Sequence, residues 1–231
     1  MQAVILAGGL GTRLRPLTYE IPKSMVLIHG KPYLEYQLAY LRQQGILDIV
    51  MLIGYLGEQI IDYFGNGDHY GVRIEYSREI TPLGTGGGLK KAEKLLNTDF
   101  LLLYGDSFLP VDYSDVFAKH KRCRANATIC LYDNRDNTDV MNNTAIDDET
   151  QKVIKYCKDK DDKTLKYVDA GVMVLNKSIL CLIPSEKVVS LEKEIFPMLI
   201  MEESLYAYVS LKRFYDIGTS ERLALAAEIF R

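Results

Sequence analysis

The sequence predicts an α/β fold: a mostly parallel β-sheet with helices on both faces, joined to a smaller antiparallel β-rich portion. Two observations predict it. Apolar strand-like runs alternate with helix-like stretches up to about residue 125, and strands joined by polar turns follow from about residue 126. Alternation is typical of parallel sheets, because parallel strands need a crossover connection that is usually a helix. Since no linker-like stretch divides the chain, we expect one domain over 1–231.

The first half carries four strand-like and three helix-like stretches in strict alternation. The first predicted helix starts at Pro32, repeats leucine every third or fourth residue and ends at Gly45. Thr85 is the expected N-cap of the third helix. The strands are expected at AVILA, DIVMLIGY, VRIEYS and DFLLLYGD, and the second and third helices at EQIIDYFG and TGGGLKKAEKLL.

The second half predicts mainly strands until the chain returns to helix near its end. Polar segments separate the strands, and the two last helices are rich in apolar residues at helical spacing. The expected strands are ATICLYD, TAIDDETQKVIKYC, KYVDAGVMVLN and YAYVS, and the expected helices are SLEKEIFPMLIMEE and SERLALAAEIF.

Composition excludes several classes of function. The formal net charge of −3 argues against nucleic-acid binding, and the basic run 119–124 is interpreted as the solvated end of a helix. No run of eighteen apolar residues and no signal peptide is found, so we expect no membrane association. The cysteines lack zinc-site spacing, which predicts reduced thiols in a cytoplasmic protein; they are Cys123, Cys130, Cys157 and Cys181.

The segment after the first strand, GGLGTRLR, predicts a phosphate site. Its glycines let backbone N–H groups approach a ligand, and Arg13 and Lys23 add positive charge. Neither common phosphate motif fits. A dinucleotide fingerprint needs glycine where Leu14 stands, and a P-loop needs glycine where Met25 stands.

The ends of two strands are expected to meet at one crevice. Gly8 and Gly9 follow the first strand, and Gly105 and Asp106 follow the fourth. In an open, Rossmann-like sheet, ligands collect at the carboxyl ends of the parallel strands. The predicted phosphate site and Asp106 therefore belong to the same place.

LAGGLGTRLRPLT followed by PKSM closely resembles the sugar-1-phosphate nucleotidyltransferases. This family joins a nucleoside triphosphate to a sugar 1-phosphate, giving a nucleotide sugar and pyrophosphate. Later segments match in the same order: PLGTGGGL, YGDSF, DAGVMVL, LEKEIFP and DIGTSERL. The resemblance implies a small stand-alone enzyme similar to the heptose-1-phosphate guanylyltransferases. About 1–125 would form its nucleotide-binding half, and about 126–231 its sugar-binding half with the C-terminal helix.

The resemblance implies that Arg13 and Lys23 are catalytic. Such an enzyme must stabilise charge on the transferred phosphoryl group and on the leaving pyrophosphate. Glu79, five residues before Gly84, matches the position that contacts the base. A carboxylate only accepts, which suits the two adjacent donors of guanine and favours GTP. The implied nucleotide-binding residues are Leu6, Ala7, Gly8, Gly9, Gly11, Thr12, Glu79, Gly84 and Thr85.

The resemblance also places Mg²⁺ at Asp106 and Asp216, since Mg²⁺ prefers one or two carboxylates together with phosphates. The alternative for Asp216 is a helix N-cap. Two departures from the family's sequence pattern leave the identity of the sugar undetermined. Asp169 stands where the family often has asparagine, and the usual Glu-Lys-Pro stretch is missing. The implied sugar-binding residues are Asp106, Gly171, Glu192 and Lys158.

The expected substrates are GTP and a heptose or hexose 1-phosphate for cell-envelope or capsule polysaccharide. One alternative is a uridylyl- or cytidylyltransferase acting on an amino-sugar phosphate or a phosphorylated alcohol. Another is a non-catalytic regulatory subunit that binds nucleotide sugars, although this chain keeps the site's cations and carboxylates. A glycosyltransferase would need a D-x-D motif after a strand, and the match at 159–161 lies in a polar connection. For a homodimer, Tyr132, Phe196 and Tyr206 are expected to be exposed at the interface.

Overall fold

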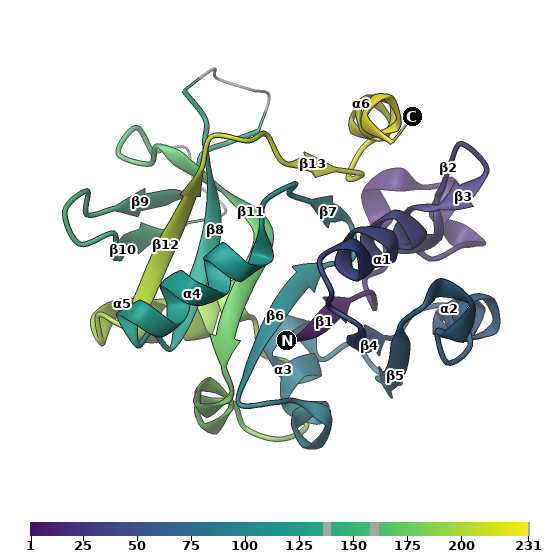
Figure 1. Cartoon of the computed structure of the whole chain (residues 1–231), viewed down its shortest axis with the longest axis horizontal. Helices are drawn as coiled ribbons and strands as arrows, with labels where there is room; N and C mark the ends of the chain where they lie inside the picture. Colours follow the sequence, from purple (N-terminus) through teal and green to yellow (C-terminus); the bar gives the residue numbers. More distant parts are fainter. Residues whose placement is uncertain (136–139, 158–161, 231) are drawn as a thin grey trace.

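The computed structural model describes residues 1–135, 140–157 and 162–230 (Figure 1). Within these residues one large sheet contains nine strands. Its parallel part is built around β1, which pairs in parallel with β4 on one edge and β6 on the other, while β4 pairs with β5. The strand order therefore reverses between β1 and β6. These strands are β1 (Gln2–Leu6), β4 (Asp48–Ile53), β5 (Arg73–Arg78) and β6 (Asp99–Tyr104).

Helices cover both faces of this sheet, as predicted. Alternate residues of β1 point to opposite faces, so Ala3 and Ile5 pack in one core and Val4 in the other. The first core also takes apolar side chains of α1, α2 and α4, and the second those of α3 and α5 (Figure 1). These helices are α1 (Tyr33–Gln43), α2 (Gly57–Phe64), α3 (Gly84–Lys91), α4 (Tyr113–Cys123) and α5 (Phe196–Met201).

Antiparallel pairing begins at β11, in agreement with the predicted change of rhythm. β11 lies antiparallel between β6 and β8, and β9 and β10 form a hairpin beside it. β12 departs from this pattern because it runs parallel to β8. The bounds are β8 (Ala127–Asp133), β9 (Thr144–Ile146), β10 (Val153–Tyr156), β11 (Tyr167–Asn176) and β12 (Leu205–Ser210).

A small third layer closes the site edge of the sheet. β7 (Ser107–Phe108) pairs with β13 (Tyr215–Asp216), and the following α6 (Ser220–Ile229) packs beside α1 through Phe230 and Tyr36 (Figure 1). The short elements are β2 (Leu27–Ile28), β3 (Lys31–Pro32), a π-helix (Leu191–Ile195), and 3₁₀ turns at Thr12–Leu14, Leu17–Tyr19, Lys23–Met25, Asp68–Tyr70, Glu93–Leu95 and Lys177–Leu182.

The predicted start of one helix and the predicted exposure of three aromatic side chains were wrong. The helix expected to start at Pro32 begins one residue later, because Pro32 takes an extended conformation in β3. Tyr132 and Phe196, expected to be exposed, are buried at 3% and 0% exposure. Tyr132 lies on the core side of β8, and Phe196 packs edge-on against Tyr156. Neither side chain is available for a homodimer interface. Tyr206, the third residue expected to be exposed, is half-buried.

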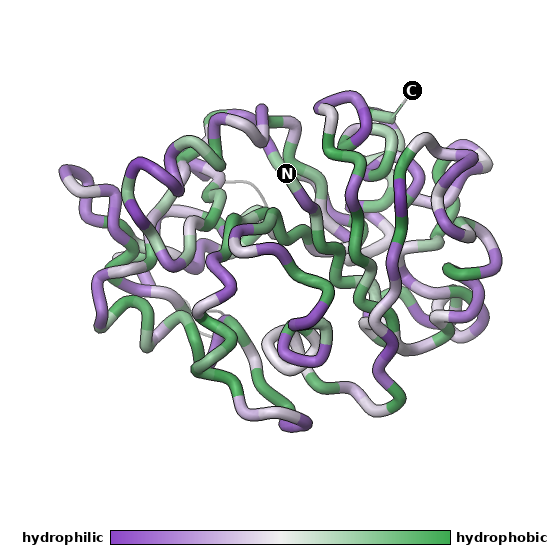
Figure 2. Tube along the Cα trace, turned by 60° about the horizontal axis from the view of Figure 1, so that its bottom comes forward, coloured by the Kyte–Doolittle hydropathy of each residue, from purple (hydrophilic) through white to green (hydrophobic). Residues whose placement is uncertain are grey.

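Hydropathy along the chain follows this architecture. Hydrophobic segments run through the central strands, and hydrophilic ones occupy many of the outer turns (Figure 2). In the described ranges, every helix is too short or too polar to cross a membrane. The four cysteines are free thiols, and Cys130 is fully buried in the core.

The close approach of β1 and β6 requires glycine at position 105. Gly105 N–H donates to the Leu6 carbonyl at 2.9 Å, and a methyl carbon on Gly105 would lie 2.7 Å from that oxygen. We expect Gly105→Ala to lower the free energy of unfolding by about 1–3 kcal/mol in chemical denaturation. Gly9→Ala is the matched control, since no described atom lies within 4 Å of its added carbon. Wild-type stability of Gly105→Ala would contradict the packing described.

Candidate active site

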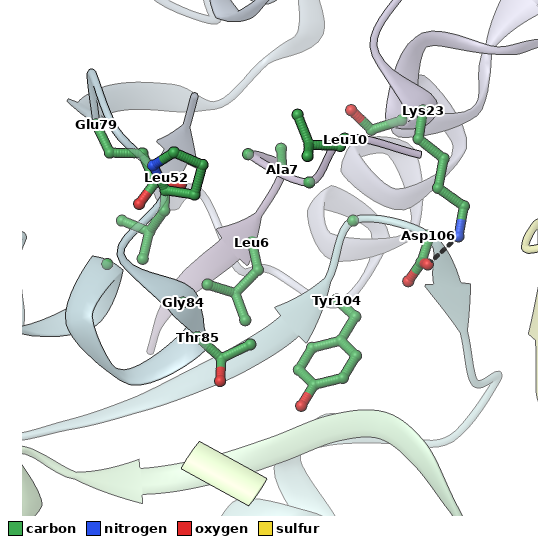
Figure 3. A pocket seen from close by; sticks show the side chains of 16 residues that line it. Leu6, Ala7, Leu10, Lys23, Leu52, Glu79, Gly84, Thr85, Tyr104 and Asp106 are labelled. Atoms are coloured by element: carbon green, nitrogen blue, oxygen red, sulfur yellow. Dashed lines mark hydrogen bonds and ion pairs between the residues drawn. The ribbon is translucent and has the colours of Figure 1, made fainter. Parts of the chain in front are cut away.

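A cavity of about 280 Å³ opens at the carboxyl ends of β1 and β6, where the strand order reverses (Figure 3). The glycines after β1 and Asp106 after β6 line it together, as the crevice prediction required. Its walls combine backbone, apolar side chains and a few charged groups. The lining residues are Leu6, Ala7, Gly8, Gly9, Leu10, Lys23, Ser24, Leu52, Glu79, Pro82, Gly84, Thr85, Gly88, Tyr104, Gly105 and Asp106.

The loop after β1 is shaped by two of its glycines. Gly11 has a φ of 61°, and a methyl carbon there would lie 2.9 Å from Thr18 Cγ2. The Thr18 hydroxyl donates to the Gly11 carbonyl at 2.7 Å, which fixes the turn. A methyl carbon on Gly8 would lie 3.0 Å from Glu79 Oε1. Gly9 stays open toward the cavity, so its backbone is accessible to a ligand.

Lys23 and Asp106 form an ion pair at one end of the cavity (Figure 3). Lys23 lies in a 3₁₀ turn, and Asp106 follows β6. Burial alone would raise the pKa of Asp106, but the Lys23 ammonium, the Ser107 hydroxyl and the Arg13 guanidinium together lower it below its usual value. Asp106 is therefore ionised across the neutral pH range, beside two cations.

Asp216 lies on the strand next to Asp106. It stands opposite Ser107 in the β13–β7 pair, and the Ile217 N–H donates to the Asp106 carbonyl at 3.0 Å. Asp216 Oδ1 accepts from the Gly218 N–H at 2.8 Å. The N-cap of α6 is Thr219, so the alternative of Asp216 as that cap is wrong.

Arg13 approaches the same two carboxylates from the loop. A methyl carbon on Gly218 would lie 3.1 Å from Arg13 Nη2 and 2.6 Å from Asp216 Oδ1. Gly218 is therefore the residue that lets the guanidinium and the carboxylate come close. Arg13 is exposed and faces the site, although it stands outside the cavity wall.

The carboxylates of Asp106 and Asp216 fit a hard divalent cation. Mg²⁺ is usually held by one or two carboxylates, with phosphates completing its shell. Both carboxylates raise the pKa of Tyr33, which is raised chiefly by burial, so they act on one buried hydroxyl. That hydroxyl has no hydrogen-bond partner among the described residues. Within the same part of the chain, no group of three acidic, His or Cys side chains is assembled to hold a metal without a substrate.

Glu79 lies at the opposite end of the cavity from Lys23 and Asp106 (Figure 3). It follows β5, and its carboxylate accepts from the Leu83 N–H at 3.0 Å. Burial raises the pKa of Glu79 above its usual value, although the Leu83 N–H and Lys91 act against this. A carboxylate held in this way can accept hydrogen bonds from a ligand inside the cavity.

The glycine run that begins α3 packs against another segment. Gly84 has a φ of 74°, and a methyl carbon there would lie 2.6 Å from the Val189 carbonyl oxygen. Thr85 is not the N-cap, because α3 starts at Gly84. Its hydroxyl donates to Glu192 Oε2 at 2.7 Å and accepts from the Leu191 N–H at 2.9 Å. Tertiary packing therefore overrides the capping preference that the sequence indicated.

Glu192 lies behind the cavity wall, in the π-helix, with 7% of its surface exposed. Tyr104 and Thr85 line the cavity and donate their hydroxyl protons to its two carboxylate oxygens. Ser190 also donates to Oε2, at 2.7 Å. Sequence reasoning missed Tyr104. The signal that could have identified it is its position at the end of an apolar strand, directly before Gly105.

Gly171 lies on β11 beside the site. Its φ is 70°, and a methyl carbon there would lie 2.8 Å from Ser107 Cβ, so it allows β11 to approach β7. Asp169 accepts from the Gly171 N–H and from the Tyr156 hydroxyl, each at 2.9 Å. Lys158, expected to bind the sugar phosphate, lies outside the described residues, as does the D-x-D match.

A family model described as nucleotidyl transferase matches residues 2–230, almost the whole length. This chain belongs to the nucleotidyl transferase family. The match confirms the resemblance seen in the opening motif and in the ordered segments that follow it. The predicted class of enzyme, a sugar-1-phosphate nucleotidyltransferase, is confirmed with it.

Similar proteins cover nearly the entire chain. The D-glycero-alpha-D-manno-heptose 1-phosphate guanylyltransferase of Aneurinibacillus thermoaerophilus is 36% identical over 220 residues, which are 94% of this chain and 93% of that protein. The mannose-1-phosphate guanylyltransferase of Mycobacterium tuberculosis is 33% identical over 224 residues, 96% of this chain but 62% of its own length.

Solved structures agree with the fold. HddC from Yersinia pseudotuberculosis, complexed with GMP-PN, superposes with a TM-score of 0.84 at 30% identity, covering 100% of this chain and 99% of that one. A putative glucose-1-phosphate thymidylyltransferase from Bacillus anthracis gives a TM-score of 0.86 at 20% identity, over 99% of this chain and 94% of that one, which shows the fold alone. The predicted Rossmann-like α/β architecture is thereby confirmed.

The predicted nucleotide residues of this nucleotidyltransferase are mostly gathered in the cavity. Gly11, Thr12 and Arg13 shape the adjoining loop, while Asp216 and Glu192 lie just outside the wall. The predicted residues that line the cavity are Leu6, Ala7, Gly8, Gly9, Lys23, Glu79, Gly84, Thr85 and Asp106. Gly105, expected at the crevice with Asp106, also lines the cavity; apart from Tyr104, the lining that sequence reasoning missed is Leu10, Ser24, Leu52, Pro82 and Gly88.

We expect Arg13→Ala to lower kcat at least about a hundredfold, the usual loss when one donor to a transition-state anion is removed. Arg13 is exposed, so thermal unfolding should stay at the wild-type temperature. Pyrophosphate release measures the rate. Arg122→Ala, an exposed arginine at the end of α4, is the matched control and should keep full activity. Near-normal kcat in Arg13→Ala would remove Arg13 from the mechanism.

Proposed function

We propose that this enzyme transfers the guanylyl group of GTP to a heptose or hexose 1-phosphate, releasing pyrophosphate and giving a GDP-sugar. The observation that carries the proposal is Glu79, a carboxylate inside the cavity at the end opposite the Lys23–Asp106 pair. This arrangement matches a guanine nucleotide, whose base has two adjacent donors for Glu79 and whose phosphates would lie at the Lys23–Asp106 end. Guanylyltransferase relatives support the same choice.

Glu79 selects the base by its hydrogen-bonding capacity. The pairing edge of guanine offers N1–H and the 2-amino group as adjacent donors, and an ionised carboxylate accepts both. Uracil and thymine offer one donor between two carbonyls, which would face the carboxylate with repulsion. Leu6, Leu52 and Pro82 supply apolar wall around the base. Because the pKa of Glu79 is raised, GTP binding weakens as pH falls through that raised value.

Phosphoryl transfer in this site depends on positioned positive charge. An oxygen of the sugar phosphate attacks the α-phosphorus, the new P–O bond forms, and the bond to the β-phosphate breaks to release pyrophosphate. The attacking phosphate oxygen is already ionised, so no general base is required. Lys23 stabilises charge near the α-phosphate, Arg13 stabilises the leaving pyrophosphate, and backbone N–H groups of 8–12 cradle the triphosphate.

Mg²⁺ is the proposed cofactor, held by Asp106 and Asp216. When bound, it neutralises phosphate charge and orients the triphosphate. Asp216 is held by the Gly218 N–H and by Arg222. Asp106 would hold the cation in place of Lys23 once Lys23 contacts phosphate. Reduced cysteines agree with a cytoplasmic enzyme, and we propose that compartment.

The acceptor is proposed to be a heptose 1-phosphate first and a mannose-type hexose 1-phosphate second. The heptose guanylyltransferase relative is 36% identical to this chain over 220 residues, and the mannose relative is 33% identical over 224 residues. On this side of the site Tyr104 lines the cavity and Asp169 carries a carboxylate, while Glu192 lies behind the wall and holds the Tyr104 hydroxyl. Such oxygens are suited to accept from the hydroxyls of a sugar.

Pyrophosphate release across GTP, ITP, UTP, CTP and dTTP, each with heptose 1-phosphate, tests the proposed function. GTP should be preferred. ITP lacks the 2-amino group, and losing one charge-assisted hydrogen bond of about 1.5–3 kcal/mol should reduce kcat/KM about ten- to a hundredfold.

Glu79→Gln is the companion variant in this assay. The amide both donates and accepts, so the gap between GTP and UTP should narrow while thermal stability is kept. A wild-type enzyme that prefers UTP, CTP or dTTP, or that treats GTP and ITP alike, would overturn the assignment of guanine to Glu79.

Replacing either carboxylate of the proposed metal pair should weaken the response to Mg²⁺. Asp106→Asn and Asp216→Asn each keep the shape of the side chain but remove a charge beside the phosphates. We expect the Mg²⁺ concentration at half-maximal rate to rise about tenfold or more in each variant. Asp112→Asn, on the exposed N-cap of α4, is the control. An unchanged Mg²⁺ titration for Asp216→Asn would remove Asp216 from the metal site.

A further inference from the structure

Arg222, the arginine of the DIGTSERL segment, forms an ion pair with Asp216 that the proposed reaction does not use. It lies in the first turn of α6, with Nη1 3.0 Å from Asp216 Oδ2 and 3.4 Å from Oδ1. The Arg222 side chain is 21% exposed and that of Asp216 13%, so the pair is largely shielded from water. Screening by solvent, which weakens most surface ion pairs, is therefore reduced here.

We propose that Arg222 is a positioning residue, which holds the Asp216 carboxylate in the orientation that binds the metal. This inference rests on the metal site of the proposed function. Asp216 Oδ1 accepts from the Gly218 N–H, and Arg222 Nη1, from α6, contacts both carboxylate oxygens. Together these donors fix the side-chain torsion of Asp216. A carboxylate that already has the binding orientation can bind a cation without the entropic cost of ordering the carboxylate side chain.

The location of Arg222 favours positioning over phosphate binding. Lys23, the cation assigned to phosphate, lines the cavity, whereas the cavity wall, as far as the described residues form it, leaves Arg222 out. Arg222 instead faces a small hollow on the outer side of Asp216, lined also by Phe214 and Leu225. It can therefore stay on Asp216 while substrates occupy the cavity.

The N-cap of α6 and the shape of the guanidinium explain why an arginine at position 222 can hold Asp216. Thr219 caps α6 by accepting from the Arg222 N–H at 3.3 Å, so the cap fixes the backbone from which the side chain extends. A single guanidinium nitrogen, Nη1, contacts both carboxylate oxygens of Asp216, and the planar guanidinium gives this donor a fixed direction, whereas an ammonium is a point charge. Groups that hold a metal ligand from behind typically change metal affinity ten- to a hundredfold when removed.

Binding of Mn²⁺ to the whole enzyme tests the inference. Electron paramagnetic resonance measures free Mn²⁺ in the presence of a non-hydrolysable GTP analogue. We expect Arg222→Gln to raise the Kd for Mn²⁺ about ten- to a hundredfold, and Arg222→Lys to raise it less. At saturating Mg²⁺, kcat should stay within about threefold of wild type. Arg73→Gln removes another Arg–Asp pair, to Asp48 at 3.0 Å, far from the site, and should bind Mn²⁺ normally.

The outcomes separate this inference from the proposed function. If Asp216→Asn weakens Mn²⁺ binding and Arg222→Gln does not, the positioning role is overturned while the metal site stands. If Asp216→Asn also binds Mn²⁺ like wild type, the metal site itself is wrong. A fall in kcat with unchanged Mn²⁺ affinity would make Arg222 a phosphate ligand instead. Should Arg222→Gln unfold, Arg222→Lys and Arg222→Met, checked by thermal unfolding, provide the same comparison.

Discussion

Parallel pairing on both edges of β1 is the constraint on which the site depends. The ladder continues past the strand ends: Ala7 N–H donates to the Leu52 carbonyl at 2.8 Å, and Gly105 N–H donates to the Leu6 carbonyl at 2.9 Å. Three strands therefore end at one edge with little freedom between them. Parallel register brings the carboxyl ends of these strands, and of β5 beside β4, to the same edge of the sheet. The loop glycines, Glu79 and Asp106 therefore line one cavity, with Glu79 and Asp106 at its opposite ends.

Pairing between cations and carboxylates at this edge of the sheet keeps the charged side chains of the site stable when no substrate is bound. Three cations face two carboxylates: Arg13, Lys23 and Arg222 against Asp106 and Asp216. A partly buried ion left alone costs several kcal/mol, whereas a paired one is nearly neutral in its effect on stability. Under the proposed function, the Lys23–Asp106 and Arg222–Asp216 ion pairs have different roles. Lys23 leaves its carboxylate for phosphate, and Arg222 remains to keep its own in place.

Sequence alone predicted the alternating half of the fold and most of the cavity, because strand ends and glycines are local signals. Contacts between segments that lie far apart in the sequence could not be predicted in this way. Thr85 looks like a helix cap until Glu192 is brought beside it by packing. The first three glycines of α3, at 84, 86 and 87, pack against the 187–189 segment. The burial of Tyr132 and Phe196 depends on which elements become neighbours. At each of these positions, the contacts and burial of the side chain depend on residues far away in the sequence.

A crystal structure with a non-hydrolysable GTP analogue and Mg²⁺ tests the central claim most directly. The claim is that one cavity binds guanine at Glu79 and phosphates at the Lys23–Asp106 end. The account predicts guanine N1 and N2 within about 3.2 Å of the Glu79 carboxylate, with the triphosphate along the loop after β1 and Lys23 released from Asp106. Guanine placed toward β11, or Glu79 turned away from the base, would contradict it.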